Sequence, residues 1–326
     1  MNNNGYSYLN LFSIDQIINE LFLAYKARKN SKALYVDEDA NSNVPLPSDL
    51  IRLYYSRPRD EQFVNIKKAF ITSYVNNESS LEDIHNKDEI DGLKEMYDYI
   101  HNGKISDPNY DLSYYDLDEL NRKLFFKTSH PELAGKYRTI PAYLPGTGTE
   151  LCPADMIRRE MYLLDKEMIQ PLVKIAREIN NCDIYQDIPK SFIARIEDIG
   201  GFWGEYTNNQ KVFYKIDAML AYLDAVVVLG CKMIKIHPYN DGNGRAIRGF
   251  INKMLEDVGF PPIYIKVNER TEYDTAMNIA NREKEYNPDY STIKQFYRYK
   301  ICDSIVELDI NGKTRNDYNK GINKVL

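Results

Sequence analysis

HPYNDGNGRAIR, residues 237–248, is the stretch of this sequence with the strongest structural signal. It follows an apolar run at 216–236 that has the length of a buried helix. That helix is predicted to end at the His-Pro step, because the residue before proline disfavours helical backbone. The Gly-Asn-Gly sequence then forms a flexible loop, and a second amphipathic helix follows at once. The stretch is therefore predicted to be a helix–loop–helix unit.

This loop holds residue types suited to phosphate chemistry. His237 is displayed at the end of a rigid helix, and backbone N–H groups at the next helix start form an anion site. Asp241 can hold Mg²⁺ that completes its octahedron with phosphate oxygens and water. Arg245 and Arg248 are three residues apart, so both project near the first turn, where guanidinium groups suit phosphate oxygens. Singly, each residue is more often structural; together they favour a catalytic phosphate site.

The stretch resembles the signature of the Fic family, HPFx(D/E)GNGRxxR, with Tyr239 where phenylalanine is usual. The resemblance covers about residues 63–308 and is strongest at 216–280. It implies a mainly α fold: a Fic-type helical core with a small β-hairpin flap and an N-terminal helical extension. It also implies a protein adenylyltransferase, which transfers AMP from Mg-ATP to a Ser, Thr or Tyr hydroxyl of a target protein.

The resemblance also assigns roles within the loop. His237 would be the general base, and Asp241 would bind Mg²⁺ between the α- and β-phosphates. The groups expected to hold the phosphates are Gly242, Asn243, Gly244, Arg245 and Arg248. A phosphate-transferring branch of the family has lysine at the position of Gly244, so glycine favours nucleotidyl transfer. A different nucleotide donor, removal of AMP, and a non-catalytic nucleotide-binding regulator are the alternatives; the intact base argues against the last.

A second segment, NNESSLED at 76–83, resembles the family's inhibitory helix motif, (S/T)xxxE(G/N). Glu82 would be the regulatory glutamate that pairs with Arg248 and displaces the γ-phosphate. Glu78 stands where Ser or Thr is expected, and Asp83 stands where Gly or Asn is expected. Without the resemblance, Glu82 would be a solvated or capping acid near a helix end.

A third segment, 135–153, begins with residues of alternating polarity at 137–140 and then carries the turn residues Pro-Gly-Thr-Gly. This pattern predicts a short hairpin. By resemblance it is the flap on which the target protein docks as an added strand. The distance from this hairpin to His237 is longer than is usual in the family, so a flap near 203–216 is an alternative. An ordinary surface hairpin is another.

Helical periodicity continues through most of the chain, at about 60–76, 88–101, 114–125, 270–284 and 291–307, and Pro153 opens a further long helix. The predicted organisation has four parts. These are an N-terminal helical extension at 1–58, a helical segment with the candidate inhibitory helix at 59–125, the Fic core at 126–308 and a flexible tail at 309–326.

Bulk composition narrows the function classes. The formal net charge is -6, which argues against broad nucleic-acid binding because phosphate backbones select basic surfaces. The 4 cysteines show no CxxC spacing, the 4 histidines show no zinc spacing, and no Walker phosphate loop occurs. The run at 216–236 carries charged residues that oppose a membrane span. These features predict a cytoplasmic protein with no membrane or nucleic-acid partner. Delivery to another cell and a homodimer remain open.

Overall fold

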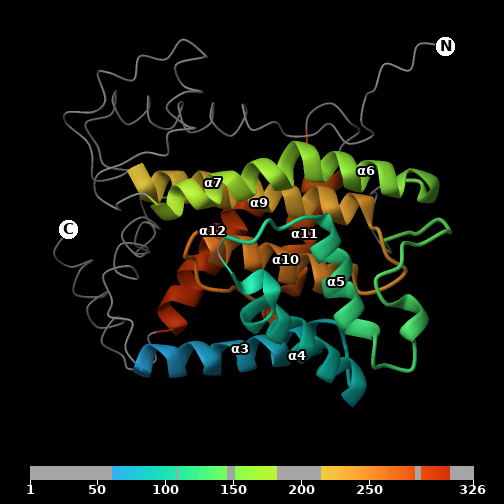
Figure 1. The fold of residues 1–326 in the computed structure, drawn as a ribbon, viewed down its shortest axis with the longest axis horizontal. Coiled ribbons are helices and arrows are strands. Elements are labelled where there is room, and N and C mark those ends of the chain that lie inside the picture. The colour runs from blue at the N-terminus through green and yellow to red at the C-terminus, as the bar shows by residue number, and fades with distance from the viewer. Residues whose placement is uncertain (1–60, 108, 145–150, 182–213, 283–287, 309–326) are drawn as a thin grey trace, which may run out of the picture.

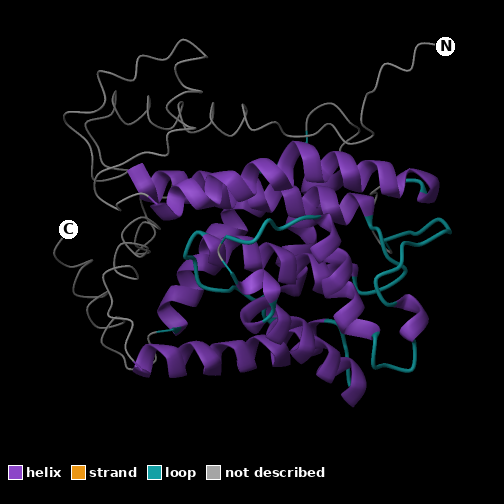
Figure 2. Cartoon of the chain, in the orientation of Figure 1, coloured by secondary structure: helices purple, strands orange, loops and turns teal. Residues whose placement is uncertain are grey.

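The computed structural model describes residues 61–107, 109–144, 151–181, 214–282 and 288–308. These residues form a mainly helical fold, which confirms the predicted class (Figures 1 and 2). The α-helices are α3 (Glu61–Leu81), α4 (Lys87–Asn102), α5 (Tyr114–Phe125), α6 (Ile157–Leu164), α7 (Gln170–Asn181), α9 (Tyr214–Ile236), α10 (Asn243–Asp257), α11 (Arg270–Arg282) and α12 (Ser291–Glu307). Short 3₁₀ turns are η1 (Lys104–Ser106), η2 (Pro131–Leu133), η3 (Ala154–Met156) and η5 (Val267–Glu269), and a π-helical turn, η4 (Asp165–Ile169), joins α6 to α7.

The helices are arranged around α10. Figure 1 shows α6, α7 and α9 along one side of the molecule and α3 and α4 along the opposite side, with α10 between them. Helix α10 contacts α9, α5, α4 and α7, and α12 packs on both α9 and α11. The described helices share one hydrophobic core. The loop at the start of α10 therefore lies where elements from both sides of the fold converge.

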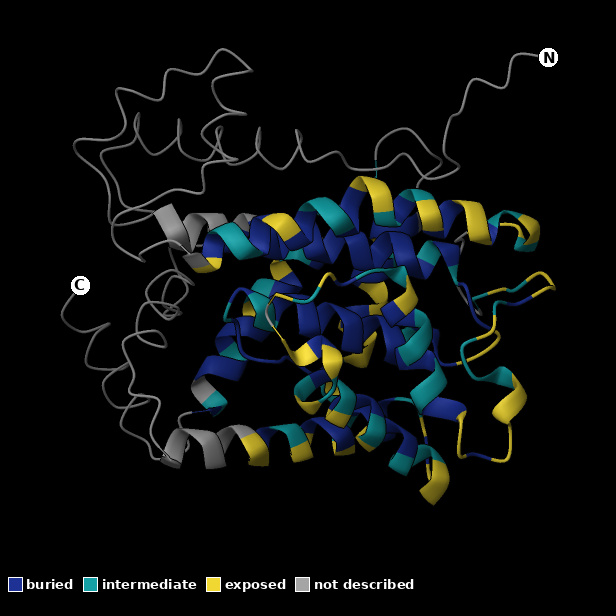
Figure 3. Cartoon of the chain, viewed as in Figure 1, coloured by how far each residue is buried: buried dark blue, intermediate teal, exposed yellow. Residues whose placement is uncertain are grey.

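The two helices flanking this loop are the most deeply buried (Figure 3). In α9 the described side chains from Tyr222 to Ile234 are all buried, so the helix is buried on all sides there, as predicted. In α10 every residue from Arg245 to Leu255 is buried, including its polar ones. Buried polar groups need partners, so α10 imposes specific contacts on the elements around it.

Local capping explains where the helices around the site begin. Helix α4 starts after Asn86, whose side chain accepts the Asp88 N–H at 2.9 Å. Helix α5 starts after Ser113, whose backbone N–H donates to the buried Asp116 carboxylate at 2.9 Å. These caps fix the registers of the two helices that supply side chains to the loop.

The predicted hairpin flap is not established by the described residues, which contain no β-strand. Tyr137 instead forms an isolated antiparallel bridge with Tyr239. The predicted turn at 145–150 lies outside the described residues, so the hairpin remains a prediction. The extension at 1–58, the tail at 309–326 and the alternative flap region up to residue 213 also lie outside them.

The described helices include none that could serve as a membrane span, since none is both long enough and apolar enough to cross a bilayer.

Candidate active site

The loop between α9 and α10 begins on a strained residue. Helix α9 ends at Ile236, and His237 follows with φ of 49°, in the left-handed region that non-glycine residues rarely adopt. Such a conformation costs on the order of 1–3 kcal/mol and persists only where the surroundings enforce it. The strain turns the chain sharply at the residue that the sequence marks as the base, which is where functional strain is expected.

Arg138 is the residue that enforces this turn. Its side chain is 2% exposed and reaches the end of α9, where carbonyl groups have no helical partner. Nε donates to the His237 carbonyl at 2.7 Å, and Nη2 donates to the Ile236 carbonyl at 3.2 Å. The Arg138 backbone N–H also donates to the Pro238 carbonyl at 2.8 Å. A guanidinium at a helix C-terminus complements the helix dipole as well.

Arg138 also ties the following segment to the loop. Nη1 donates to the Ile140 carbonyl at 2.9 Å, and Nη2 also binds the Cys152 carbonyl. The Cys152 N–H donates to the Lys235 carbonyl at 3.0 Å. Both ends of the predicted flap are thus attached to the end of α9.

His237 is held in its neutral form. Burial lowers its pKa to about 4, and the nearby positive charge of Arg138 acts in the same direction. An imidazole with this pKa is unprotonated at neutral pH, so it can accept a proton. This is the state that a general base requires.

The loop between α9 and α10 is held in shape by side-chain amides. Gly242 has φ of 73°, and a Cβ there would lie 2.6 Å from Cε2 of Phe125, so only glycine fits. Asn121 donates to the Asp241 carbonyl at 3.0 Å. Asn243 accepts the Tyr239 N–H at 2.9 Å and donates to the Tyr239 carbonyl at 2.8 Å. The Asn243 amide therefore braces the loop, and the phosphate contact that sequence reasoning assigned to it would require these bonds to open.

Asp241 and Arg245 lie together at the mouth of the loop. Asp241 accepts the Gly242 N–H at 2.5 Å and Arg245 Nη2 at 3.2 Å, while its side chain stays 58% exposed. Arg245 is buried, lies over the Phe125 ring and approaches Glu89 of α4 at 3.4 Å. The described residues contain no cluster of three metal-ligating side chains. One accessible carboxylate still fits Mg²⁺, which commonly takes its remaining ligands from phosphates and water.

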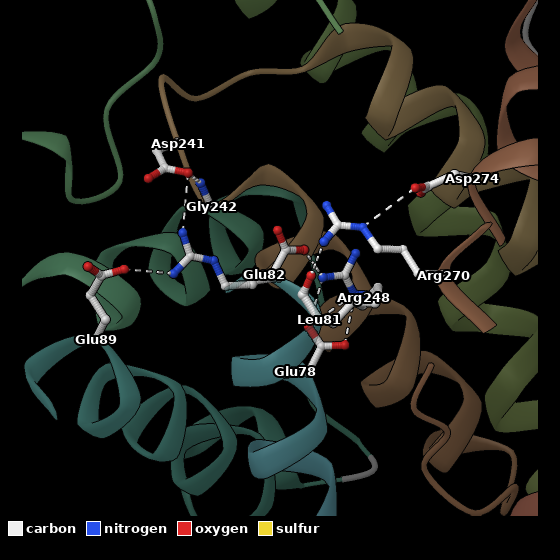
Figure 4. Close-up of polar contacts among 10 residues, drawn as sticks. Glu78, Leu81, Glu82, Glu89, Asp241, Gly242, Arg248, Arg270 and Asp274 are labelled. Atoms are coloured by element: carbon white, nitrogen blue, oxygen red, sulfur yellow. Dashed lines mark hydrogen bonds and ion pairs between the residues drawn. The ribbon is translucent and has the colours of Figure 1, made fainter. Parts of the chain in front are cut away.

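Two carboxylates, Glu78 of α3 and Glu82 just after the end of α3, hold Arg248 (Figure 4). Glu82 accepts a hydrogen bond from Nη2 of Arg248, so the two residues pair as the motif resemblance implied. Glu78 is fully buried and accepts Nε at 2.8 Å and Nη2 at 2.8 Å. Burial raises the pKa of Glu78, while the Arg248 charge opposes the rise. Burial also disfavours ionisation of Glu82, but the charges of Arg248 and Arg245 outweigh it and lower the Glu82 pKa.

The end of α3 presents Glu82 through a C-terminal cap. The Ile84 N–H donates to the Ser79 carbonyl at 2.7 Å and the Asp83 N–H to the Ser80 carbonyl at 3.4 Å, the pattern of a Schellman cap. Asp83 has φ of 56°, which explains why glycine or asparagine suits this position of the motif. Arg270 adds a further bond, from Nη1 to the Leu81 carbonyl at 2.6 Å.

Replacing Asp83 by glycine is therefore expected to stabilise the protein by about 0.5–1 kcal/mol, because glycine adopts the left-handed conformation without a Cβ penalty. The lost contact with His85 is exposed and contributes little. Urea unfolding would measure the change. Asp98→Gly, inside α4, is the matched control and should destabilise instead. If Asp83→Gly has a lower free energy of unfolding than the wild type, the backbone of Asp83 is not strained.

Tyr239, the departure from the usual phenylalanine, has a specific partner. Its buried hydroxyl donates to Asp118 of α5 at 2.6 Å, and the Tyr137 hydroxyl donates to the same carboxylate at 3.2 Å. Burial raises the pKa of Asp118 to about 6. Asp118 thus links α5, the loop between α9 and α10, and the segment after α5.

Comparison with known proteins agrees with this geometry. Residues 176–255 match the model of the Fic/DOC family. A stretch of 59 residues is 34% identical to protein adenylyltransferase fic-1 of Caenorhabditis elegans, and 50 residues are 44% identical to protein adenylyltransferase Fic of Nematostella vectensis. These alignments cover 18% and 15% of this chain but only 12% of either relative.

Solved structures share the fold over a much longer range. Fic-1 from C. elegans superposes with a TM-score of 0.53 at 16% identity, over 89% of this chain and 76% of that one. A Fic domain-containing signaling protein from Bacteroides thetaiotaomicron gives 0.55 at 16% identity, over 82% of this chain and 96% of that one. The helical architecture is that of the Fic fold. The segment that holds the signature loop also matches the Fic/DOC family.

Proposed function

We propose that this protein is an adenylyltransferase that moves AMP from Mg-ATP to a Ser, Thr or Tyr hydroxyl of a target protein. The observation that supports the proposal most strongly is the neutral His237 on a strained turn, one short loop away from Asp241 and Arg245. A binding protein needs a phosphate cradle but no base. The Fic/DOC family model matches this segment, and a 50-residue stretch of the chain is similar to a protein adenylyltransferase, which adds support.

In the proposed reaction, His237 takes the proton from the target hydroxyl, and the hydroxyl oxygen attacks the α-phosphorus of ATP. The new O–P bond forms as the bond to the β-phosphate breaks, and pyrophosphate leaves. Arg245 lies at the first turn of α10, where it would neutralise the leaving group's charge. Mg²⁺, when held by Asp241, would supply further charge neutralisation on the phosphates. A preorganised loop lowers the barrier mainly through positioning and electrostatics.

Gly244 is consistent with nucleotidyl transfer. A Cβ there would lie 2.8 Å from Nη1 of Arg248 and 3.2 Å from the Glu82 carboxylate. The lysine found in the phosphate-transferring branch would have to displace these groups. The donor is therefore expected to lie with its α-phosphorus at the base.

The target protein would dock on the segment that follows Tyr137. The bridge between Tyr137 and Tyr239 places this segment beside the catalytic loop. Ile140 is 64% exposed and Tyr143 is 85% exposed, so apolar side chains are available there to a partner. An extended peptide pairing with this segment would bring its hydroxyl toward His237.

Glu82 would regulate the reaction by occupying Arg248. Its carboxylate lies beside Gly244 at the start of α10, where a terminal phosphate would need the same guanidinium. Competition between Glu82 and the γ-phosphate would turn ATP away from a productive pose.

ATP labelled separately at the α- and γ-phosphates tests the activity. Label from the α position on protein, with none from the γ position, is the expected result. Protein labelled only from the γ-phosphate would show a kinase and contradict the proposal. An absence of label from either position, with a nucleotide bound, would favour a non-catalytic regulator.

The pKa of His237 predicts an unusual pH profile. Because the base acts only when unprotonated, activity should persist as pH falls and be lost through about pH 4. A histidine with an ordinary pKa would instead lose activity near pH 6.5, roughly. The measurement is kcat/KM for AMP transfer against pH, with circular dichroism at each pH to confirm that the protein remains folded. A limb near the ordinary value would contradict the buried, neutral base.

A further inference from the structure

Arg248 has one more carboxylate partner than the inhibitory motif requires. Of its four hydrogen bonds to carboxylates in the described structure, three go to Glu78, the residue that stands in place of Ser or Thr. The two N–H groups of Nε and Nη2 face the two carboxylate oxygens, which is the bidentate arrangement of a strong arginine–carboxylate pair. Glu82 contributes a single contact, to Nη2.

The two acids differ in their surroundings. The Glu78 side chain is 0% exposed and lies one helical turn before the end of α3, whereas the Glu82 side chain is 31% exposed at that end. Removing the only partner of a buried arginine would leave an uncompensated charge, which is strongly unfavourable. Glu78 prevents this outcome, because Arg248 keeps a counter-ion after Glu82 departs.

The pair also fixes the guanidinium's direction. With Nε and Nη2 bound by Glu78, Nη1 lies on the side of Gly244, where an added Cβ would be 2.8 Å from it. Glu78 thereby sets which edge of the Arg248 guanidinium remains toward the proposed nucleotide site. Figure 4 shows the pair. At the same time, the negative charge of Glu78 cancels much of the attraction that Arg248 offers to a further anion.

We infer that Glu78 is a positioning and specificity-determining residue: it is the permanent counter-ion of Arg248 and weakens the site's preference for a third phosphate. The inference rests on the proposed nucleotide site. Glu82 is then the exchangeable partner of Arg248. When Glu82 departs, the affinity for ATP rises less than it would if Arg248 had no other carboxylate partner. Donors with a diphosphate and donors with a triphosphate are bound with similar strength.

The α,β-methylene analogues of ADP and ATP test this directly, because their α–β bridge cannot be cleaved. Calorimetric titration is made on the full chain with Glu82→Gly and on the double variant with Glu78→Gln added. In the single variant, the two analogues should bind within about threefold of each other. In the double variant, the triphosphate should be favoured by roughly a further tenfold, the scale of one charged hydrogen bond. Glu89→Gln in the Glu82→Gly background is the control, since it removes the negative charge of Glu89 beside Arg245, leaves the Asp241 contact in place and should affect both analogues alike.

A general structural defect would weaken both analogues equally and leave their ratio unchanged. An unchanged ratio in a folded double variant that binds both analogues would overturn the role of Glu78. If the double variant does not fold, the single variant decides. A triphosphate preference above about thirtyfold there would show Arg248 free despite Glu78 and would also overturn it. Binding of neither analogue to the single variant would instead overturn the proposed nucleotide site, and this inference with it.

Discussion

Replacing His237 by alanine is expected to lower AMP transfer by about 10²–10⁴-fold, the usual contribution of a positioned base. The expectation follows from the neutral state of the imidazole and from the strained turn that Arg138 enforces. The phosphate loop is braced by Asn121 and Asn243, which do not depend on the imidazole. ATP affinity should therefore change little. The measurement is the initial rate of α-label incorporation at saturating ATP, together with calorimetric ATP binding.

His130→Ala is a suitable control, because His130 is exposed and pairs only with the neighbouring Glu132 at 3.2 Å in the described structure. It should leave the transfer rate unchanged. A His237→Ala variant that keeps more than about a tenth of the wild-type rate would exclude it as the base. A variant that loses ATP binding as well would point to a structural role for the imidazole.

The central part of the fold could be predicted because its signals are local. An apolar run, a His-Pro step and a Gly-Asn-Gly loop place α9, the loop and α10 within one short segment. Asp241 and Arg245 are four residues apart across the start of α10, so they are close in sequence, and they meet at 3.2 Å. The end of α4 also has a local signal, because Gly103 follows the helix directly.

Contacts between distant segments could not be predicted in the same way. Arg138 binds the His237 carbonyl across 99 residues of sequence, and Asn121 binds the Asp241 carbonyl across 120. An arginine or an asparagine in a polar segment carries no periodicity that marks it as buried. Tyr239 gave one usable signal, since an extra hydroxyl at a buried position requires a partner, but nothing in the sequence identified that partner as Asp118.

The inhibitory segment shows the limit of a motif. The pairing of Glu82 with Arg248 could be expected from the resemblance, and the structure places the two together. The substitution at Glu78 looked like a weakening of the motif. It instead supplies the bidentate partner, because a glutamate one turn earlier on the same face of α3 reaches the same guanidinium. The other departure, Asp83, keeps the helix cap at the cost of a strained φ.

Replacing Glu82 by glycine is expected to raise the transfer rate of the isolated protein by roughly tenfold. One charged hydrogen bond contributes on the order of 1.5 kcal/mol, and each 1.4 kcal/mol is about a factor of ten. A larger rise would suit a bidentate Glu82, but the bidentate contact belongs to Glu78. The variant should remain folded, since Arg248 keeps that partner. The measurement is the initial rate of self-modification with α-labelled ATP.

Asp83→Gly is the matched control, because it puts glycine at the adjacent position of the same helix end and leaves the Glu82 contact in place. It should not raise the rate, so a rise in both variants would indicate loosening of α3 rather than release of Arg248. Equal rates for wild type and Glu82→Gly, with equal ATP affinity, would remove the regulatory role of Glu82. The base, the metal carboxylate and the phosphate loop lie on a different segment from α3, so that result would leave the proposed transfer reaction intact.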